Sequence, residues 1–240
     1  MPAAKFEQIY DSLKGKILSG EYPRDSMLPS EHQLTEEYEC SRNTIRRAIA
    51  MLAREGYVQS IHGKGVQVIY TPVKQTAFII GGIETFAESA KRQNLPAVTE
   101  VVHFAEIIVD NRISDKTGFP EGAEVYYIQR VRKLDGKPVI LDINMLLKSE
   151  APGLTEEIAS RSIYEYLENE LQMVIVTSNR QINSQRATPA DSIYLDLVDY
   201  DFVSVVTGQT YNSKGVMFEW TQSRHRPDYF VFFDTAIRKR

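Results

Sequence analysis

The chain has a single cysteine, Cys40, among its 240 residues, and it lacks any long apolar segment. One cysteine excludes an internal disulfide framework and is typical of a protein in a reducing compartment. No run of about 18 apolar residues is present, and the first residues do not resemble a secretion signal. We therefore expect a cytoplasmic protein with no membrane span.

Histidine is also scarce, with only His32, His62, His103 and His225. Their spacing does not match HExxH, and with one distant cysteine no zinc site is predicted. A Walker loop and a GxSxG nucleophile elbow are absent as well. We therefore predict no catalytic residues, no metal and no cofactor, with an acid–base pair of His225 and Glu219 as the enzymatic alternative.

Basic residues are outnumbered by acidic ones: the sequence has 28 lysine and arginine residues and 32 aspartate and glutamate residues, for a net charge of −4. This balance argues against a protein that coats nucleic acid. The distribution is uneven: residues 40–65 hold five basic side chains and one acidic one, whereas residues 1–39 hold four basic and eight acidic ones. A small basic face on an acidic body indicates modest non-specific affinity and DNA binding by two copies.

Residues 28–52 have the pattern of two short helices joined by a tight turn. Ser30 and Gln33 form a capping box at the start of the first helix. Ser41 caps the second helix, whose apolar residues recur at i, i+4 and i+7 from Ile45. The layout is that of a helix-turn-helix, although a two-helix hairpin with a solvated basic face has the same pattern.

The polar face of the second helix supplies the candidate DNA contacts. They are Arg42, Asn43, Thr44, Arg46 and Arg47, to which we add Ser30 at the start of the first helix. Arg42 and Arg46 lie four apart on one face, where each can pair with guanine O6 and N7 in the major groove. The other side chains are expected to reach phosphates or neighbouring base edges.

Two short β-branched runs flank a basic, glycine-rich tip downstream of these helices. The tip consists of His62, Gly63, Lys64 and Gly65. Such a tip between two strands is typical of a wing that contacts the minor groove. The segments LPSE, SRNTIRRAIAML, EGYV and HGKGV resemble the N-terminal domain of the GntR family of bacterial transcription regulators. The resemblance implies a winged helix-turn-helix that binds a palindromic operator as a homodimer.

The composition changes after Tyr70, so we expect a DNA-binding domain at 1–70, a linker at 71–76 and a second domain at 77–240. Strands are predicted at 98–110, 124–134, 138–146, 174–183, 202–211, 216–224 and 229–233. Helices are predicted at 85–93, 110–117, 162–171 and 189–195. Hairpin turns are expected at Asp135-Gly136 and Lys214-Gly215. Mostly antiparallel strands with interspersed helices predict an α+β domain.

Arg130 and Arg132 are two residues apart in a predicted strand, so they point to one face of the sheet. Adjacent guanidinium groups repel each other unless an anion or carboxylates lie between them. A phosphate site is one interpretation, and ion pairs with Asp142 and Glu219 are the other.

Hydroxyl groups recur at the predicted helix starts, with Thr85 at one and Ser162 and Tyr164 at another. Free backbone N–H groups there favour an anion, but Ser162 is equally interpreted as a simple N-cap. The segment from Glu219 to Arg226 mixes carboxylate, amide, guanidinium and imidazole groups, which suits a polyhydroxy ligand.

The segments TFAE, RVRKLDGKPVILD, SIYEYLE and EWTQSRHRPDYF resemble the effector domain of the HutC subfamily of this family, which has a chorismate-lyase-like (UTRA) fold. Within the subfamily, SIYEYLE, TQSRHRPDYF and VILD resemble the trehalose operon repressors of Gram-positive bacteria, whose inducer is trehalose 6-phosphate. The resemblance implies phosphate contacts from Thr85, Arg130, Arg132, Ser162 and Tyr164. It implies contacts to sugar hydroxyls from Asp142, Glu219, Arg224 and His225.

The expected function is therefore repression of a trehalose operon, relieved by trehalose 6-phosphate. Two alternatives stay open. One is a regulator of the same family that responds to another ligand, such as an amino-sugar phosphate. The other is a sugar-phosphate-binding protein without regulatory activity.

Overall fold

A computed structural model of the chain describes residues 4–71, 83–92 and 94–232. The described residues divide into two compact units, with residues 4–71 in the first and residues 83–92 and 94–232 in the second. Apart from Thr71, the predicted linker lies outside the described residues. No described helix combines the length and the apolar character needed to cross a membrane.

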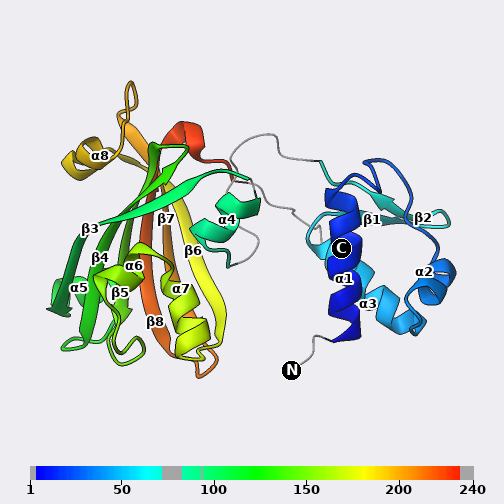
Figure 1. Ribbon diagram of the computed structural model, residues 1–240, viewed down its shortest axis with the longest axis horizontal. Helices are drawn as coiled ribbons and strands as arrows, with labels where there is room; N and C mark the ends of the chain where they lie inside the picture. Colours follow the sequence, from blue (N-terminus) through cyan, green and yellow to red (C-terminus); the bar gives the residue numbers. More distant parts are fainter. Residues whose placement is uncertain (1–3, 72–82, 93, 233–240) are drawn as a thin grey trace. The chain divides into compact units, whose positions relative to one another are not determined.

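The first unit contains three helices and a two-stranded antiparallel sheet (Figure 1). Its elements are α1 Lys5–Leu18, α2 Glu31–Glu37, α3 Arg42–Arg54, β1 Val58–Ile61 and β2 Gly65–Val68. Both predicted caps are confirmed. The Ser30 hydroxyl accepts a hydrogen bond from the Gln33 backbone N–H, and the Ser41 hydroxyl accepts one from that of Thr44. The predicted helix-turn-helix is therefore formed by α2 and α3.

The core of this unit lies between α1 and α3, where Leu13, Ile45 and Leu52 are all fully buried. The backbone N–H of Leu28 donates to the carbonyl of Val66 at 2.8 Å, which ties the segment before α2 to the wing formed by β1 and β2. At the wing tip Gly63 has a φ of 73°, a conformation that glycine adopts without steric cost.

The second unit is a six-stranded antiparallel sheet with strand order β3-β4-β5-β8-β7-β6. Its strands are β3 Ala97–Ile108, β4 Glu124–Leu134, β5 Lys137–Leu147, β6 Ile175–Arg186, β7 Phe202–Asn212 and β8 Met217–His225. Its α-helices are α4 Phe86–Arg92, α5 Asn111–Thr117, α6 Glu156–Ser160, α7 Ile163–Glu165 and α8 Pro189–Tyr194. Six predicted strands and both hairpin turns are confirmed, as is the α+β class.

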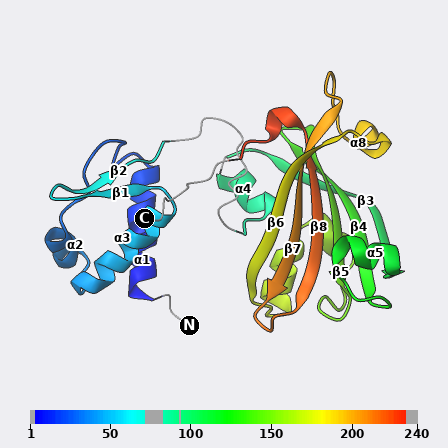
Figure 2. The same ribbon diagram turned by 180° about the vertical axis from the view of Figure 1, so that it is seen from behind.

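The two faces of the sheet are covered differently. In Figure 1, α6 and α7 lie in front of the sheet, where Ile163 and Leu167 pack on Ile128 and Leu146. Figure 2 shows the reverse face, with α5 in front of it. There Trp220, only 2% exposed, packs in a cluster with Phe119 and is a core residue. Apolar packing therefore anchors both faces.

Two predicted elements differ from the structure. The predicted strand 229–233 is absent from the described residues 229–232, because β8 ends at His225 and Pro227 begins a 3-10 helix, η2 Pro227–Tyr229. Proline cannot donate a ladder hydrogen bond, which favours this ending. The predicted helix 162–171 is instead α7 followed by a π-helix, η1 Tyr166–Glu170, closed by the Leu171 N–H donating to the Tyr166 carbonyl.

One short helix escaped prediction. Residues 156–160 form α6, which is capped by the Thr155 hydroxyl accepting a hydrogen bond from the Ile158 backbone N–H at 3.3 Å. Five residues are too few for a helical periodicity to be recognised.

Candidate functional site

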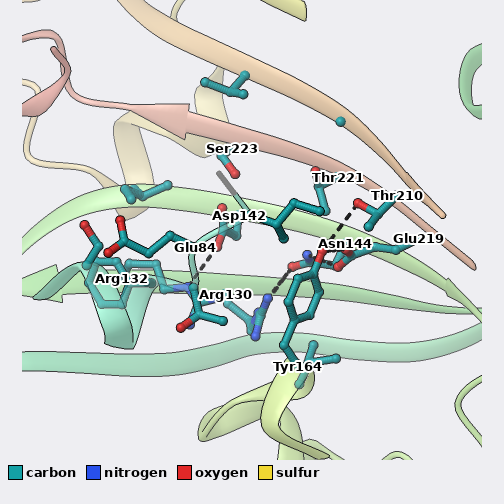
Figure 3. A pocket seen from close by; sticks show the side chains of 18 of the residues that line it. Glu84, Arg130, Arg132, Asp142, Asn144, Tyr164, Thr210, Glu219, Thr221 and Ser223 are labelled. Carbon is teal, nitrogen blue, oxygen red and sulfur yellow. Dashed lines mark hydrogen bonds and ion pairs between the residues drawn. The ribbon is translucent and has the colours of Figure 1, made fainter. Parts of the chain in front are cut away.

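A pocket in the second unit opens over the face of the sheet that α7 covers (Figure 3). The described residues of the segment 83–89, at and before α4, form one wall, and residues 161–164 at the start of α7 form another. Its floor consists of side chains from five strands, β4 through β6 in the order of the sheet. Most of these side chains are polar.

Strand register explains why polar groups converge there. Arg130 on β4 is paired with Asp142 on β5, which is paired with Ser223 on β8. Directly paired residues point to the same face of a sheet, and so do residues two apart on one strand. The polar residues that alternate along each strand therefore lie on the same face of the sheet and form one continuous polar surface.

A continuous hydrogen-bond chain crosses this surface. Arg130, 4% exposed, donates from Nε and Nη2 to the Asn144 Oδ1 atom at 3.2 and 2.9 Å. The Asn144 amide donates to Glu219 Oε1 at 3.1 Å, and the Tyr164 hydroxyl donates to Glu219 Oε2 at 2.6 Å (Figure 3). These side chains are held in place before any ligand is bound, which is the arrangement expected of a preorganised polar site.

Arg132 has a different environment. Its Nε donates to Asp142 Oδ2 at 2.8 Å, its Nη1 donates to Thr99 Oγ1 at 2.7 Å, and its guanidinium lies 5.3 Å from the ring centroid of Phe86. The alternative of an ion pair is thus correct for Arg132 and Asp142. It does not hold for Glu219, whose carboxylate is hydrogen-bonded to a neutral amide and a phenol.

Burial shapes the charge of this surface. Burial, followed by the positive charge of Arg132, lowers the pKa of Arg130 to about 9, so the guanidinium stays charged at neutral pH. Burial alone would raise the pKa of Asp142, but the charges of Arg132 and Arg130 hold it below its usual value. Burial raises the pKa of Glu219, against the hydrogen bonds from Tyr164 and Asn144. The pocket therefore offers fixed positive charge beside hydrogen-bonding oxygen atoms.

The remaining predicted effector residues differ in position. Thr85 and Ser162 line the pocket, but both hydroxyls also cap helices, accepting from the backbone N–H groups of Glu88 and Glu165. His225 is 4% exposed and lines the pocket, with its ring centroid 4.9 Å from that of Phe230. Both interpretations of Ser162 therefore stay compatible with the structure.

Arg224 lies on the opposite face of the sheet, since it is one residue away from His225 on β8. Its Nε and Nη2 donate to the two oxygens of Asp191 at 2.7 and 2.8 Å, and its Nη1 donates to Gln185. Asp191 belongs to α8, and its side chain is fully buried. Arg224 does not line the pocket, and we leave it out of the effector site.

Several pocket residues were not singled out from the sequence. They are Asn144, Ser178, Arg180, Gly208, Thr210, Thr221 and Ser223. The alternation of the strands contained a signal for Asn144, which is two residues after Asp142, and for Thr221 and Ser223, which alternate with Glu219. For the residues of β6 and β7 the pairing partners were needed, and those are set by tertiary structure.

In the first unit, the candidate DNA contacts gather on the exposed side of α3. Arg42 and Asn43 are exposed, and within the described part of the chain Arg42 has no carboxylate partner. Arg46 donates from Nε to both oxygens of Glu31 at 3.0 Å, which links α3 to α2. The Arg47 guanidinium lies 3.6 Å from the ring centroid of Phe6. Among the described residues, Arg42 is therefore the arginine of this group with neither an ion pair nor a ring contact.

The other predicted DNA contacts are also near the surface. The wing-tip residues His62, Gly63 and Lys64 are exposed in the turn between β1 and β2, and Gly65, also exposed, is the first residue of β2. Ser30 is exposed as well, although its hydroxyl is bonded to the Gln33 side chain at 2.8 Å. The Thr44 hydroxyl is bonded to that of Ser41 at 2.9 Å. Among residues 4–71, 83–92 and 94–232, no group of histidine, cysteine and acidic side chains is arranged to hold a metal ion.

Comparison with known proteins assigns both units. The family described as "Bacterial regulatory proteins, gntR family" matches residues 5–68, and the family described as "UTRA domain" matches residues 92–231. The HTH-type transcriptional regulator TreR of Bacillus subtilis is 36% identical over 238 residues, covering 99% of this chain and 99% of that protein. These families and relatives are transcription regulators, not enzymes.

Solved structures agree with this assignment. The effector-binding domain of the Bacillus subtilis trehalose repressor (TreR) is 34% identical, with a TM-score of 0.54 over 60% of this chain and 99% of that chain. A possible transcriptional regulator, YydK from Bacillus subtilis, has a TM-score of 0.80 over 98% of this chain and 100% of that chain. At 19% identity, this second likeness concerns the fold alone.

The position of Arg224 leads to a prediction about stability. Arg224→Ala leaves the Asp191 carboxylate buried without its cation, so we expect the free energy of unfolding to fall by about 3–5 kcal/mol. Effector affinity should be unchanged. Urea unfolding and calorimetric titration of the full chain measure the two quantities. Lys148→Ala, which removes ion pairs with the exposed carboxylates of Glu106 and Glu124, is the control and should lower stability much less. If Arg224→Ala lost effector affinity while its free energy of unfolding stayed unchanged, Arg224 would belong to the effector site after all.

Burial of His225 predicts a pH dependence of stability. Burial lowers the pKa of this histidine from 6.5 to about 4. Between these two pH values the histidine is protonated in the unfolded chain and neutral in the folded chain. The contribution of neutral His225 to the free energy of unfolding is fully present above the unfolded-state pKa. It decreases as the pH falls from about 6.5 towards 4, by at most about 1.4 kcal/mol per pH unit. His225→Gln should flatten urea-unfolding free energies over this range, whereas His103→Gln, at an exposed position, should not. Equal slopes in wild type and His225→Gln would contradict the prediction.

Proposed function

Since the chain belongs to the GntR family of bacterial transcription regulators and carries a UTRA domain, we propose that it represses a sugar-utilisation operon of the trehalose type and is released by trehalose 6-phosphate. Regulators of this kind bind operator DNA and a small-molecule effector. The proposal concerns the direction of regulation, the identity of the effector and the residues involved. It includes action in the cytoplasm.

The observation that carries the ligand class is the buried pair of arginines. Arg130 and Arg132 are 4% and 8% exposed and keep unused N–H donors that face the pocket. Guanidinium groups bind phosphate strongly because their planar array of donors matches its oxygens. We therefore assign the phosphate to this pair, with Thr85, Ser162 and Tyr164 around it.

The uncharged part of the ligand is assigned to the oxygen-rich remainder of the pocket. Asp142, Glu219 and His225 line it and offer acceptors and donors suited to sugar hydroxyls. The choice of trehalose 6-phosphate is supported by the full-length similarity to TreR, whose effector domain is described as that of a trehalose repressor.

The DNA-binding mode is proposed from the first unit. In a homodimer, two copies of α3 would occupy successive major grooves of a palindromic operator, with Arg42 as the main base contact and Asn43, Thr44, Arg46 and Arg47 around it. Ser30 and the wing tip at 62–65 would contact the backbone and the minor groove. We assign residues 1–70 to DNA binding, 71–76 to a linker and 77–240 to effector binding and dimerisation.

Induction is proposed to act by population shift. Trehalose 6-phosphate would bind more tightly to the arrangement of the two DNA-binding domains that does not fit the operator. A near-complete release requires a difference in effector affinity of about 5.5 kcal/mol between the two arrangements. An effector that bound both arrangements equally would not change operator occupancy.

Fluorescence anisotropy on a palindromic promoter fragment tests the function. Trehalose 6-phosphate should release the wild-type protein, whereas glucosamine 6-phosphate and free trehalose should not. Arg130→Ala should bind the operator with unchanged affinity but should no longer be released by trehalose 6-phosphate, because a guanidinium group that contacts the phosphate is removed. DNA binding that is indifferent to every sugar would reject the effector, and release by free trehalose would reject the phosphate site.

The role of Arg42 predicts a loss of base preference. Arg42→Ala should cost about 1–3 kcal/mol of binding free energy per half-site and relax selectivity at one base position. Arg54→Ala, at the exposed far end of α3, is the control and should change operator affinity little. Binding to a set of single-base operator variants measures both effects. An equal loss on operator and random DNA would make Arg42 a phosphate contact instead.

A further inference from the structure

Four arginines line the pocket, and they differ in how they are engaged. Arg130 is bonded to Asn144, Arg132 to Asp142, and Arg161 to Glu157. Arg180 on β6 has no carboxylate within 4 Å, and its side chain makes no hydrogen bond to any of the described residues. It therefore presents a full set of N–H donors at the rim of the pocket.

The position of Arg180 in the sheet separates it from the paired arginines. Arg130 and Arg132 are on β4, whereas Arg180 is on β6, and β5, β8 and β7 lie between them. Four interstrand spacings amount to about 19 Å along the sheet. A ligand whose phosphate lay at β4 would have to extend over β5, β8 and β7 to reach the strand that carries Arg180.

Gly208 lies on the floor of the pocket beside Arg180. Arg180 is paired with Gly208 on β7, and Gly208 is paired with Thr221 on β8. A Cβ atom at position 208 would come within 2.8 Å of the Thr221 Oγ1 atom and 3.5 Å of the Ser178 Oγ atom. The missing side chain thus allows these hydroxyl groups to lie close to the backbone of β7, and a side chain at this position would displace them.

The environment of Arg180 suits sugar hydroxyls. Tyr164 and Glu219 act electrostatically on its guanidinium, but both are already bonded to each other. The hydroxyl groups of Ser178 and Thr210 lie on the same part of the floor and are 3.3 Å apart. A ring placed here meets donors and acceptors on several sides, with Arg180 as its charged contact.

We propose that Arg180 is a specificity-determining residue of the effector site, which binds the sugar ring farthest from the phosphate and selects a two-ring over a one-ring phosphosugar. The inference rests on the proposed function and deepens it. Gly208 has the supporting role of keeping the floor of this second ring free. Nothing in the sequence patterns or in the resemblance pointed to either residue.

Calorimetric titration of the full-length protein with trehalose 6-phosphate and glucose 6-phosphate tests the proposal. Wild type should bind the two-ring compound more tightly. Arg180→Ala should lower its affinity about tenfold or more and leave that for glucose 6-phosphate unchanged, since a hydrogen bond from a charged donor is lost with one ligand only. Gly208→Ala should act in the same direction. Arg186→Ala, on the same strand but outside the pocket, is the matched control.

The outcomes separate the two proposals. An equal loss for both compounds, or no loss for either, overturns the role of Arg180 and leaves the phosphosugar-responsive regulator intact. Equal wild-type affinities for the two compounds would remove the second subsite. A wild-type protein that binds neither compound refutes the proposed effector, and this inference is refuted with it.

Discussion

The burial of two adjacent arginines on one strand is the constraint on which the second unit depends. Arg130 and Arg132 share one face of β4, and each buried guanidinium must find hydrogen-bond partners. β5 supplies them from positions two residues beyond the directly paired ones, with Asn144 for Arg130 and Asp142 for Arg132. On β8, Glu219 and His225 lie on the same face and extend the polar surface. The pocket is thus a consequence of how the pair is accommodated.

This accommodation leaves the site preorganised but incompletely satisfied. The chain from Arg130 through Asn144 and Glu219 to Tyr164 fixes the side chains at their positions, so an effector does not have to order them. Arg130 is hydrogen-bonded to a neutral amide rather than to a carboxylate, and Arg132 is paired with Asp142. The proposed phosphosugar would match this arrangement, because its phosphate would contact the guanidinium groups and its hydroxyls would contact the oxygen atoms.

The opposite face of the sheet uses the same chemistry for another purpose. The Arg224–Asp191 pair beneath α8 is bidentate, and both side chains are nearly inaccessible. Neither residue lines the pocket, and the pair connects α8 to the sheet. Arg130 and Arg224 have similar burial, but they lie on opposite faces of the sheet and have different partners.

The sequence by itself determined the elements, because caps, periodicity and turn residues act over a few positions. Ser30, Ser41, the strands of the sheet and both hairpins follow from such local rules. Strand alternation also contained the information that separates His225 from Arg224, although residue type alone grouped them together. Only the tertiary structure decided which strands are neighbours. Gly208 and Arg180 became part of the pocket because β6 and β7 pair beside β8, and no local pattern records a partner that is distant in the chain.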